Sequence, residues 1–348
     1  MNDRSLSMKD LGLPSDRCLV IGEVAQAHDG SLGTAHAFID AIADAGGSAV
    51  KFQTHIAAQE STYDEPWRVR FSRQDDTRFD YWKRMEFTEE QWMGLAQHAQ
   101  ERGLLFTSSP FSVAAVELLD RIGVAFWKVA SGELGNPELL EAIWATKRPI
   151  VFSSGMSTIA ELEYVTAESR QRQIPYSVLQ CSSRYPCPPE MWGLMSVAGF
   201  RDRFRCPSGL SDHSGTIYAG LAAATLGAEI IEVHVAFHKK MFGPDVNSSV
   251  TVEEFEMLVE GVNQIKRAML SGYDKDAAAC QAGDMKKIFG RSLALKQDMA
   301  AGSVIQERDL TLKKPGSGIP YERRDDLIGR RLKTDKSAFF LLSMEDIE

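Results

Sequence analysis

The sequence has few cysteines, and nothing in their spacing suggests a disulfide framework. The chain of 348 residues contains 5 cysteines, an odd number, and no Cys-x-x-Cys motif. Such sparse usage is typical of a protein kept reduced and excludes a small scaffold held together by disulfides. We therefore expect a cytoplasmic protein. The first residues, MNDRSLSMKDLGLPSDR, also lack the apolar segment of a secretory signal peptide.

Long apolar runs and an excess of positive charge are missing as well. No run approaches the roughly 20 apolar residues of a membrane-spanning helix. The 39 Lys and Arg residues are outnumbered by 48 Asp and Glu, which gives a formal net charge of −9. We therefore expect no membrane insertion and no general binding of nucleic acid. The composition, 44% hydrophobic and 25% charged, is that of a globular protein with a large core.

The sequence does contain eight short β-branched runs that alternate with amphipathic stretches, seven of which are evident. The strand-like runs are 18–24, 48–54, 104–109, 125–131, 149–154, 176–182, 205–211 and 228–235. The stretches with helical spacing are 34–46, 88–103, 113–123, 137–147, 159–173, 216–227 and 252–270. This order predicts an α/β fold, a closed parallel (β/α)8 TIM barrel. A doubly wound sheet is the alternative, but no Gly-x-Gly-x-x-Gly follows the first run.

The C-terminal residues lack the strand–helix alternation of the rest of the chain, so we expect more than one domain. The predicted TIM-barrel domain spans 17–270, a linker spans 271–284, and a small β-rich domain spans 285–348. The last of these has short strand-like segments around the turn KKPGSGIPYE and no long helix. A long aromatic and charged insertion, 55–87, follows the second predicted strand and should lie over the mouth of the barrel.

Every predicted strand ends in polar or charged side chains. In a β/α barrel the C-terminal strand ends form the active site, so these side chains should converge. They are Glu23, Lys51, Gln53, Ser108, Ser109, Lys128, Ser131, Glu133, Ser153, Ser154, Ser182, Ser183, Ser211, His213 and His234. The turn 243–245 follows the last strand, and Asp245 there either points at the mouth or is solvated.

Two of these side chains are lysines, and their chemistry has three interpretations. Lys51 or Lys128 could form a Schiff base with a carbonyl substrate. Alternatively, the two ammonium groups and the neighbouring serine hydroxyls could bind a phosphate, or a phosphate and a carboxylate. The third interpretation is a structural salt bridge inside the barrel.

Two histidines follow the seventh and eighth strands, which are neighbours in a closed barrel. Inward-facing imidazoles of His213 and His234 could share a divalent cation. Two ligands make an incomplete cage, so water and a substrate oxygen would fill the other positions, as a Lewis acid requires. A purely structural role is the alternative. The weaker metal candidates are His28, His55 and His238.

Several ordered motifs resemble one enzyme family. They are IGEVAQAHDGSLGTA, AVKFQT, SSPFS, WKVASGE, FSSGMST, LQCSSRYPCP, GLSDHSGT and GPDVNSSV. In these segments the chain resembles the sialic acid synthases, which include the N-acetylneuraminate, legionaminate and pseudaminate synthases. The C-terminal segment, with KKPGSGI and the final DIE, is similar to the antifreeze-like (SAF) domain of that family.

The resemblance implies a reaction and a set of roles. Phosphoenolpyruvate would condense with an N-acylated amino sugar, such as N-acetylmannosamine, to give a nine-carbon 3-deoxy-ulosonic acid and phosphate. Residues matching the phosphoenolpyruvate site are Lys51, Ser109, Lys128, Ser131, Ser153, Ser183 and Ser211. Residues matching the sugar site are Glu23, Gln53, Glu133, Tyr185 and Asp245. His213 and His234 match the ligands of the divalent metal, Mn²⁺ or Mg²⁺.

The same family implies a domain-swapped homodimer. Its antifreeze-like domain covers the partner's barrel mouth and presents a basic residue, which Lys314 matches here. The chain departs from the family pattern at Ala27, Asp29, Ser183, Val233 and Lys314, where Asn, Asn, Asn, Lys and Arg are usual. These departures concern the choice of sugar rather than the reaction class. A Schiff-base pyruvate aldolase and a non-catalytic ice- or carbohydrate-binding protein remain as alternatives.

Overall fold

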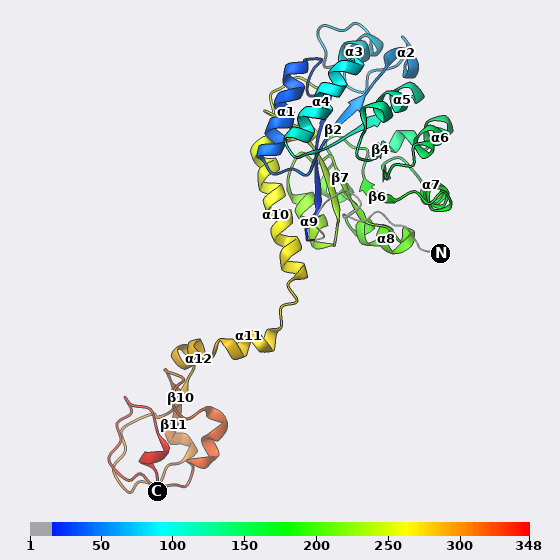
Figure 1. Ribbon diagram of the computed structural model, residues 1–348. Coiled ribbons are helices and arrows are strands. Elements are labelled where there is room, and N and C mark those ends of the chain that lie inside the picture. The colour runs from blue at the N-terminus through cyan, green and yellow to red at the C-terminus, as the bar shows by residue number, and fades with distance from the viewer. Residues whose placement is uncertain (1–15) are drawn as a thin grey trace. The chain divides into compact units, whose positions relative to one another are not determined.

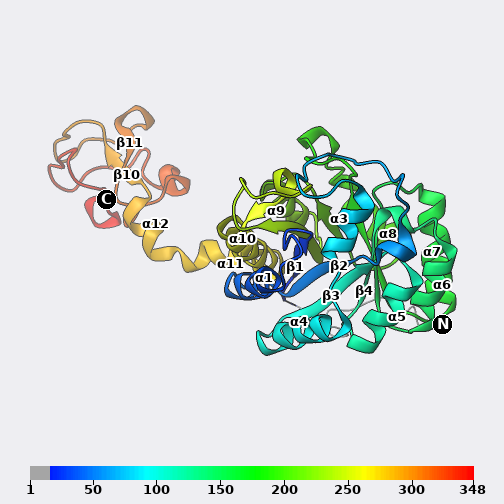
Figure 2. The same ribbon diagram turned by 90° about the horizontal axis from the view of Figure 1, so that it is seen from above.

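The chain forms two units in the computed structural model, which describes residues 16–348. The first unit ends at Ser271 and the second spans Gly272–Glu348. The first unit is a closed barrel of parallel strands surrounded by helices, as seen from the side in Figure 1 and from above in Figure 2. This architecture confirms the predicted TIM barrel.

The strands follow one another around the barrel in sequence order. They are β1 Leu19–Ala25, β2 Ala49–Thr54, β3 Leu105–Pro110, β4 Trp127–Val129, β5 Ile150–Ser153, β6 Tyr176–Cys181, β7 Ser208–Asp212 and β8 Ile230–Ala236. Pairing of β1 with β8 closes the ring, and a two-residue strand, β9 (Val250–Thr251), adds to β8. In this register Glu23 lies beside both Lys51 and His234, which places three predicted site residues at one level.

The barrel helices lie close to the predicted stretches. They are α1 Leu32–Asp44, α4 Glu89–Glu101, α5 Val113–Ile122, α6 Pro137–Ala145, α7 Ile159–Gln171, α8 Met195–Phe204, α9 Tyr218–Thr225 and α10 Val252–Leu270. Capping boxes at Thr88, Thr158 and Thr251 begin three of them, because each hydroxyl and the side chain three residues later satisfy free backbone N–H groups. The sequence did not reveal α8, which has no side-chain cap and contains Gly199.

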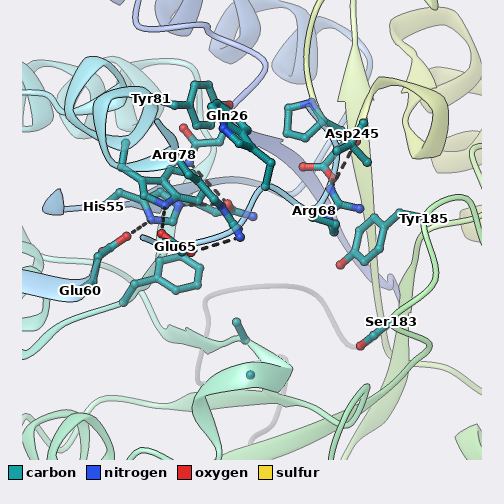
Figure 3. Close-up of a pocket in the computed structure, with 18 of the residues that line it drawn as sticks. Gln26, His55, Glu60, Glu65, Arg68, Arg78, Tyr81, Ser183, Tyr185 and Asp245 are labelled. Carbon is teal, nitrogen blue, oxygen red and sulfur yellow. Dashed lines mark hydrogen bonds and ion pairs between the residues drawn. The ribbon is translucent and has the colours of Figure 1, made fainter. Parts of the chain in front are cut away.

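The insertion after β2 folds into two short helices and an aromatic cluster of its own. The helices are α2 (Ala57–Glu60) and α3 (Arg78–Met85). Their buried residues Tyr81 and Trp82 pack with Trp67 and Phe71 of the connecting loop. As predicted, the insertion lies at the mouth of the barrel, where several of its side chains line a cavity (Figure 3).

The barrel interior is divided into an apolar layer and a polar layer. Side chains alternate along a strand, so every second residue points inward. At the lower level these are apolar, among them Leu19, Ile21, Phe126 and Ile230, which form a compact cluster. At the next inward position toward the C-terminal strand ends, some of the side chains are charged, for example Glu23. The interior is therefore mainly apolar below and charged at its C-terminal end.

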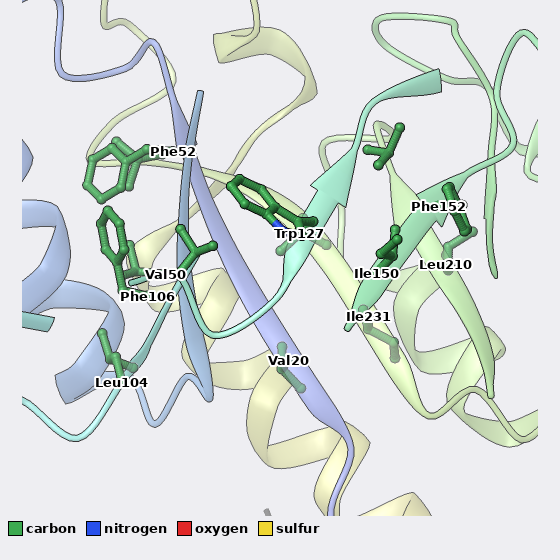
Figure 4. Close-up of a cluster of buried hydrophobic side chains, with 14 of the residues drawn as sticks. Val20, Val50, Phe52, Leu104, Phe106, Trp127, Ile150, Phe152, Leu210 and Ile231 are labelled. Carbon is green, nitrogen blue, oxygen red and sulfur yellow. The ribbon is translucent and has the colours of Figure 1, made fainter. Parts of the chain in front are cut away.

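The residues between these inward positions face the helices and form the main core. Val20, Val50, Phe52, Trp127 and Phe152 belong to this buried cluster, which Figure 4 shows in part. It continues into the helices through residues such as Phe38, Trp144 and Phe255. This alternation explains why the strands read as nearly continuous apolar runs.

The second unit is small and has its own core. After α11 (Lys275–Gln281) and α12 (Gly283–Phe289), strands β10 (Ser292–Leu295) and β11 (Leu310–Lys313) pair antiparallel. Isolated bridges join the remaining extended segments, and Leu293, Ile305, Leu327 and Leu342 are buried together. The expected linker 271–284 thus contains helix α11. Among the described helices of both units, none is long and apolar enough to span a membrane.

Barrel closure can be tested at a glycine. A Cβ on Gly209 would lie 1.8 Å from the Ile230 carbonyl oxygen, whereas one on Gly94 in α4 meets nothing within 4 Å. We expect Gly209→Ala to lower the free energy of unfolding by about 3 kcal/mol through overpacking. The control Gly94→Ala should raise it by up to about 1 kcal/mol. All 6 tryptophans lie between residues 67 and 192, so tryptophan fluorescence in urea reports the barrel alone. Equal midpoints for the two variants would contradict the tight β7–β8 contact.

Candidate active site

Four charged side chains lie together inside the polar layer of the barrel. The Lys51 Nζ is 2.8 Å from Glu23 Oε1 and 3.4 Å from Glu232 Oε1, and the Lys128 Nζ is 3.4 Å from the same Glu232 oxygen. We call Glu23, Lys51, Lys128 and Glu232 the buried charge cluster. Each side chain is at most 4% exposed, so two ammonium groups and two carboxylates balance one another out of contact with water.

The electrostatics of the two lysines differ. Burial acts to lower the pKa of Lys51, but Glu23 and Glu232 outweigh it, and the pKa is raised. For Lys128 burial dominates and the pKa is lowered, although Glu232 opposes the change. Burial acts to raise the pKa of Glu23, yet His234, Lys51 and Lys128 hold it well below its usual range. Glu23 is therefore an anion at neutral pH.

Serine hydroxyls surround the cluster. Lys51 donates to Ser109 Oγ (3.3 Å) and Lys128 to Ser153 Oγ (2.6 Å), while Ser211 donates to Glu232 (2.9 Å). A second pair, Ser131 and Ser183, has its oxygens 3.4 Å apart. A Cβ on Gly155 would lie within 2.8 Å of both oxygens, so only glycine leaves this hydroxyl pair open.

The predicted histidine pair is brought together. The rings of His213 and His234 have centroids 5.3 Å apart. His213 Nδ1 donates to the Ser182 carbonyl (3.1 Å), and Tyr185 donates its hydroxyl hydrogen to His213 Nε2 (3.0 Å). His234 Nε2 lies 3.5 Å from Glu23 Oε2. Burial, with His234, lowers the pKa of His213 to about 3, so its imidazole is neutral and Nε2 keeps a lone pair.

Above these buried groups lies a cavity of about 440 Å³. Figure 3 shows many of the side chains that line it. The predicted site residues among its lining are Gln53, Ser131, Glu133, Ser183, Tyr185, His234 and Asp245. The others lie beneath it, each at most 5% exposed: Glu23, Lys51, Ser109, Lys128, Ser153, Ser211 and His213. Lys314 belongs to the second unit, where its Nζ lies 5.4 Å from the centre of the Phe289 ring.

Two side chains connect the cavity with the buried groups. Gln53 lines the cavity and donates from Nε2 to Glu23 Oε1 at 2.9 Å. Tyr185 lines the cavity and contacts His213 through its hydroxyl. Burial raises the pKa of Tyr185, which therefore stays a hydrogen-bond donor. A ligand in the cavity would thus touch the same side chains that position the charged layer.

The insertion supplies cavity residues that the sequence did not single out. Arg68 Nη2 lies 2.5 Å from Asp245 Oδ1, and the guanidinium stacks 4.4 Å from the centre of the Tyr185 ring. Arg78 Nη1 lies 3.1 Å from Glu65 Oε1. Arg68 and Asp245 are 177 residues apart, so no local pattern could have joined them. The composition of the insertion was the one available signal.

Glu232 was also missed, although a signal for it existed. It precedes His234 by two residues in β8, and strand alternation places both on the inward face. Its Oε2 has no hydrogen-bond partner among the described residues. Two of the weaker histidine candidates have other partners: His55 binds Glu60 between the Trp82 and Phe111 rings, and His28 accepts from the Gly30 N–H.

Comparison with known proteins assigns the chain to a family. Residues 38–274, more than half of the chain, match the NeuB family, and residues 290–346 match the SAF domain. The chain belongs to the NeuB family. This membership confirms the resemblance noted in the sequence, including the nature of the C-terminal domain.

Relatives in the NeuB family are synthases of related acids. The chain is 30% identical to N,N′-diacetyllegionaminic acid synthase of Campylobacter jejuni over 90% of this chain and 95% of the relative. It is also 30% identical to human N-acetylneuraminate-9-phosphate synthase, over 90% and 88%. The solved N-acetylneuraminic acid synthetase of Leptospira borgpetersenii, at 27% identity, superposes with a TM-score of 0.68 over 78% of this chain and 91% of that one. The chain is therefore an enzyme of the same transferase type.

The buried charge cluster predicts strong coupling between its members. Glu232→Gln leaves two buried ammonium groups opposite one carboxylate, so it should lower the free energy of unfolding by about 3 kcal/mol. Lys128→Met leaves two buried carboxylates opposite one ammonium group and should also be destabilising. The double variant restores the charge balance and should lose clearly less than the sum of the two, as measured by urea unfolding. Additive losses would show that the cluster does not act as a unit. Glu89→Gln, at a solvent-exposed ion pair with Arg121, is the control and should change little.

Proposed function

We propose that the protein condenses phosphoenolpyruvate with an N-acylated amino sugar aldehyde and water. C3 of phosphoenolpyruvate would form a bond to the aldehyde carbon of the sugar. The oxygen of water would add at C2, and phosphate would leave by cleavage of the C2–O bond. The products would be a nine-carbon 3-deoxy-ulosonic acid and inorganic phosphate. The observation that carries the proposal is a pair of buried lysines with serine hydroxyls directly beneath a cavity large enough for a sugar.

The lower part of the site suits a small, highly charged anion. Phosphoenolpyruvate carries a phosphate and a carboxylate, and both need cationic and hydroxyl donors. Ser131 and Ser183 face the cavity beside Gly155, while Lys51 and Lys128 supply positive charge just below. A fixed ammonium group in a dry environment stabilises the charge that develops on a departing phosphate more than it would in water.

The upper part of the site suits a polyol with an acylated nitrogen. Gln53, Tyr185 and Asp245 offer donors and acceptors around the cavity. Burial raises the pKa of Glu133, whose carboxyl oxygens can accept hydrogen bonds from sugar hydroxyl groups. Glu23 reaches the cavity through Gln53 and would orient the sugar's reacting end above the lysines.

A divalent metal, Mn²⁺ or Mg²⁺, fits the histidine pair. His213 Nδ1 carries the proton, so the Nε2 lone pair, which accepts the Tyr185 hydroxyl hydrogen here, would turn to the ion, and His234 Nε2 lies near the Glu23 carboxylate. When bound, the ion supplies a Lewis acid that polarises the sugar aldehyde. In residues 16–348 no group of three or more His, Cys, Asp or Glu side chains could hold a metal. Water and substrate would therefore complete its coordination.

A pyruvate aldolase remains the second candidate because of Lys128. Burial lowers the pKa of this lysine, and a neutral amine is what Schiff-base formation requires. The proposed condensation needs no covalent adduct. Borohydride reduction in the presence of pyruvate, followed by mass spectrometry, distinguishes the two reactions. An adduct on Lys128 or Lys51 would favour the aldolase.

The condensation is tested with phosphoenolpyruvate labelled with ¹⁸O at the bridging position and a panel of N-acylated amino sugars. We expect sugar-dependent release of phosphate that retains the label, because the C2–O bond breaks. Lys51→Ala and Lys128→Ala should raise the KM for phosphoenolpyruvate by about 30-fold or more, as expected for loss of a buried charged contact. The KM for the sugar should change little. Phosphate without the label would contradict C–O cleavage.

Metal binding is tested directly by calorimetric titration of the full chain with Mn²⁺. His213→Ala and His234→Ala should each weaken binding by at least about tenfold, since each removes one of two nitrogen ligands. His36→Ala is the matched control. His36 on α1 forms a separate histidine pair with His98 on α4, and their Nδ1 atoms lie 2.8 Å apart. Unchanged Mn²⁺ affinity in the first two variants would exclude this pair as the metal site.

We also propose a homodimer in which the partner's SAF domain covers the barrel mouth and presents Lys314. Exposed aromatic residues of the second unit, Phe339 (90% exposed) and Phe340 (67%), support burial against another surface. Lys314→Ala and His213→Ala homodimers should both turn over poorly. Mixing them should restore activity, because one intact barrel then receives a wild-type Lys314. No recovery in heterodimers shown by mass spectrometry to have formed would contradict the exchange.

A further inference from the structure

The sugar proposed above could be neutral or phosphorylated, and the named relatives include both kinds. At the same 30% identity, one relative is named for legionaminic acid and another for a 9-phosphate. The walls of the cavity, however, carry more negative than positive side chains. If the protein has the proposed function, on which this inference rests, that charge determines the class of sugar that the cavity accepts.

Carboxylates outnumber cations in the lining of the cavity. The charged residues that line it are Glu60, Glu65, Arg68, Arg78, Glu133 and Asp245. The histidines left out of the count, two guanidinium groups and four carboxylates give 2 − 4 = −2. Adding one lysine from a partner chain would leave −1. A phosphate monoester brings a charge of about −1.5 to −2 at neutral pH, so it would enter a site of the same sign.

Neither guanidinium is available to a phosphate without breaking an ion pair. Arg68 is held by Asp245 and by the Pro244 carbonyl, and it stacks on Tyr185. Arg78 is held by Glu65 at 3.1 Å and by the Pro66 carbonyl at 3.0 Å, and it stacks on Trp82 at 5.1 Å. Each cation is thus neutralised by a carboxylate of the same wall.

The remaining wall is aromatic. Trp67, Phe71, Tyr81, Trp82 and Phe111 all line the cavity. Such faces suit the C–H surface of a sugar ring and the methyl groups of acyl substituents, whereas they give nothing to a phosphate. The lysines that could bind a phosphate, Lys51 and Lys128, lie below the cavity, where the proposed function assigns them to phosphoenolpyruvate.

We infer that the cavity takes an uncharged N-acylated sugar and rejects the sugar phosphate, and that the Arg78–Glu65 pair enforces the choice. The pair keeps a guanidinium in the wall as a rigid, neutralised support for Trp82, whose indole N–H also binds Glu65 at 2.9 Å. Removing the carboxylate charge exposes a free cation to the cavity. The preference should then move toward a phosphorylated sugar.

The test compares N-acetylmannosamine with its 6-phosphate on the full chain. Binding is measured first, by quenching of tryptophan fluorescence, because Trp67 and Trp82 line the cavity. The neutral sugar should bind at least about 100-fold more tightly than the phosphate. Phosphate release from phosphoenolpyruvate is then measured with each sugar, and kcat/KM should favour the neutral one by a similar factor.

Glu65→Gln should raise the relative affinity for the phosphorylated sugar by about tenfold. Glu89→Gln is the matched control: it removes the same charge from an Arg121 pair between α4 and α5, which does not line the cavity, and should leave the ratio unchanged. Equal or tighter binding of the 6-phosphate by the unmodified chain would overturn the inference. So would an unchanged ratio in Glu65→Gln. Preferred binding of the neutral sugar without release of phosphate would instead support the inference and overturn the proposed reaction.

Discussion

The desolvation of two ammonium groups and two carboxylates is the constraint around which the barrel is organised. A charge removed from water is tolerated only where opposite charges and hydrogen-bond donors replace the lost solvent. Strand alternation points Lys51, Lys128, Glu23 and Glu232 into the barrel, where they contact one another above an apolar layer. Serine hydroxyls then satisfy the remaining hydrogen bonds of the lysines. The result is a rigid, preorganised set of charges, which is what electrostatic catalysis needs.

The site has a buried level and a cavity wall that differ in charge, and two side chains contact both. The buried level holds the lysines and the neutral His213, whereas the cavity walls carry paired arginines and an excess of carboxylates. Gln53 and Tyr185 belong to both levels, since each lines the cavity and contacts a buried group. Two chemically different substrates could therefore be held by different levels of one site while their reacting carbons meet at the boundary.

Local regularity decides how much of this could be predicted from the sequence. Short β-branched runs and helical spacing identified the barrel strands and most helices. The rule that barrel sites lie at strand ends predicted that Lys51, Lys128, His213 and His234 would converge. Glu232 could have been added by the same alternation. The Arg68–Asp245 pair could not, because it depends on how a long irregular loop folds back over the mouth. Helix α8 lacks the clear helical spacing that marked the predicted stretches.

The insertion at the barrel mouth has a consequence for the evolution of this enzyme type. It begins directly after β2 and ends just before α4, and Tyr81, Trp82, Met85 and Ala57 give it a small core of its own. The loop therefore supplies one wall of the cavity from a nearly autonomous segment, while the buried charge cluster belongs to the strands. If the proposed function holds, exchange of this one segment between homologous barrels would alter which sugar is accepted and leave the bond-forming groups intact. Substrate range and chemistry would then be inherited separately.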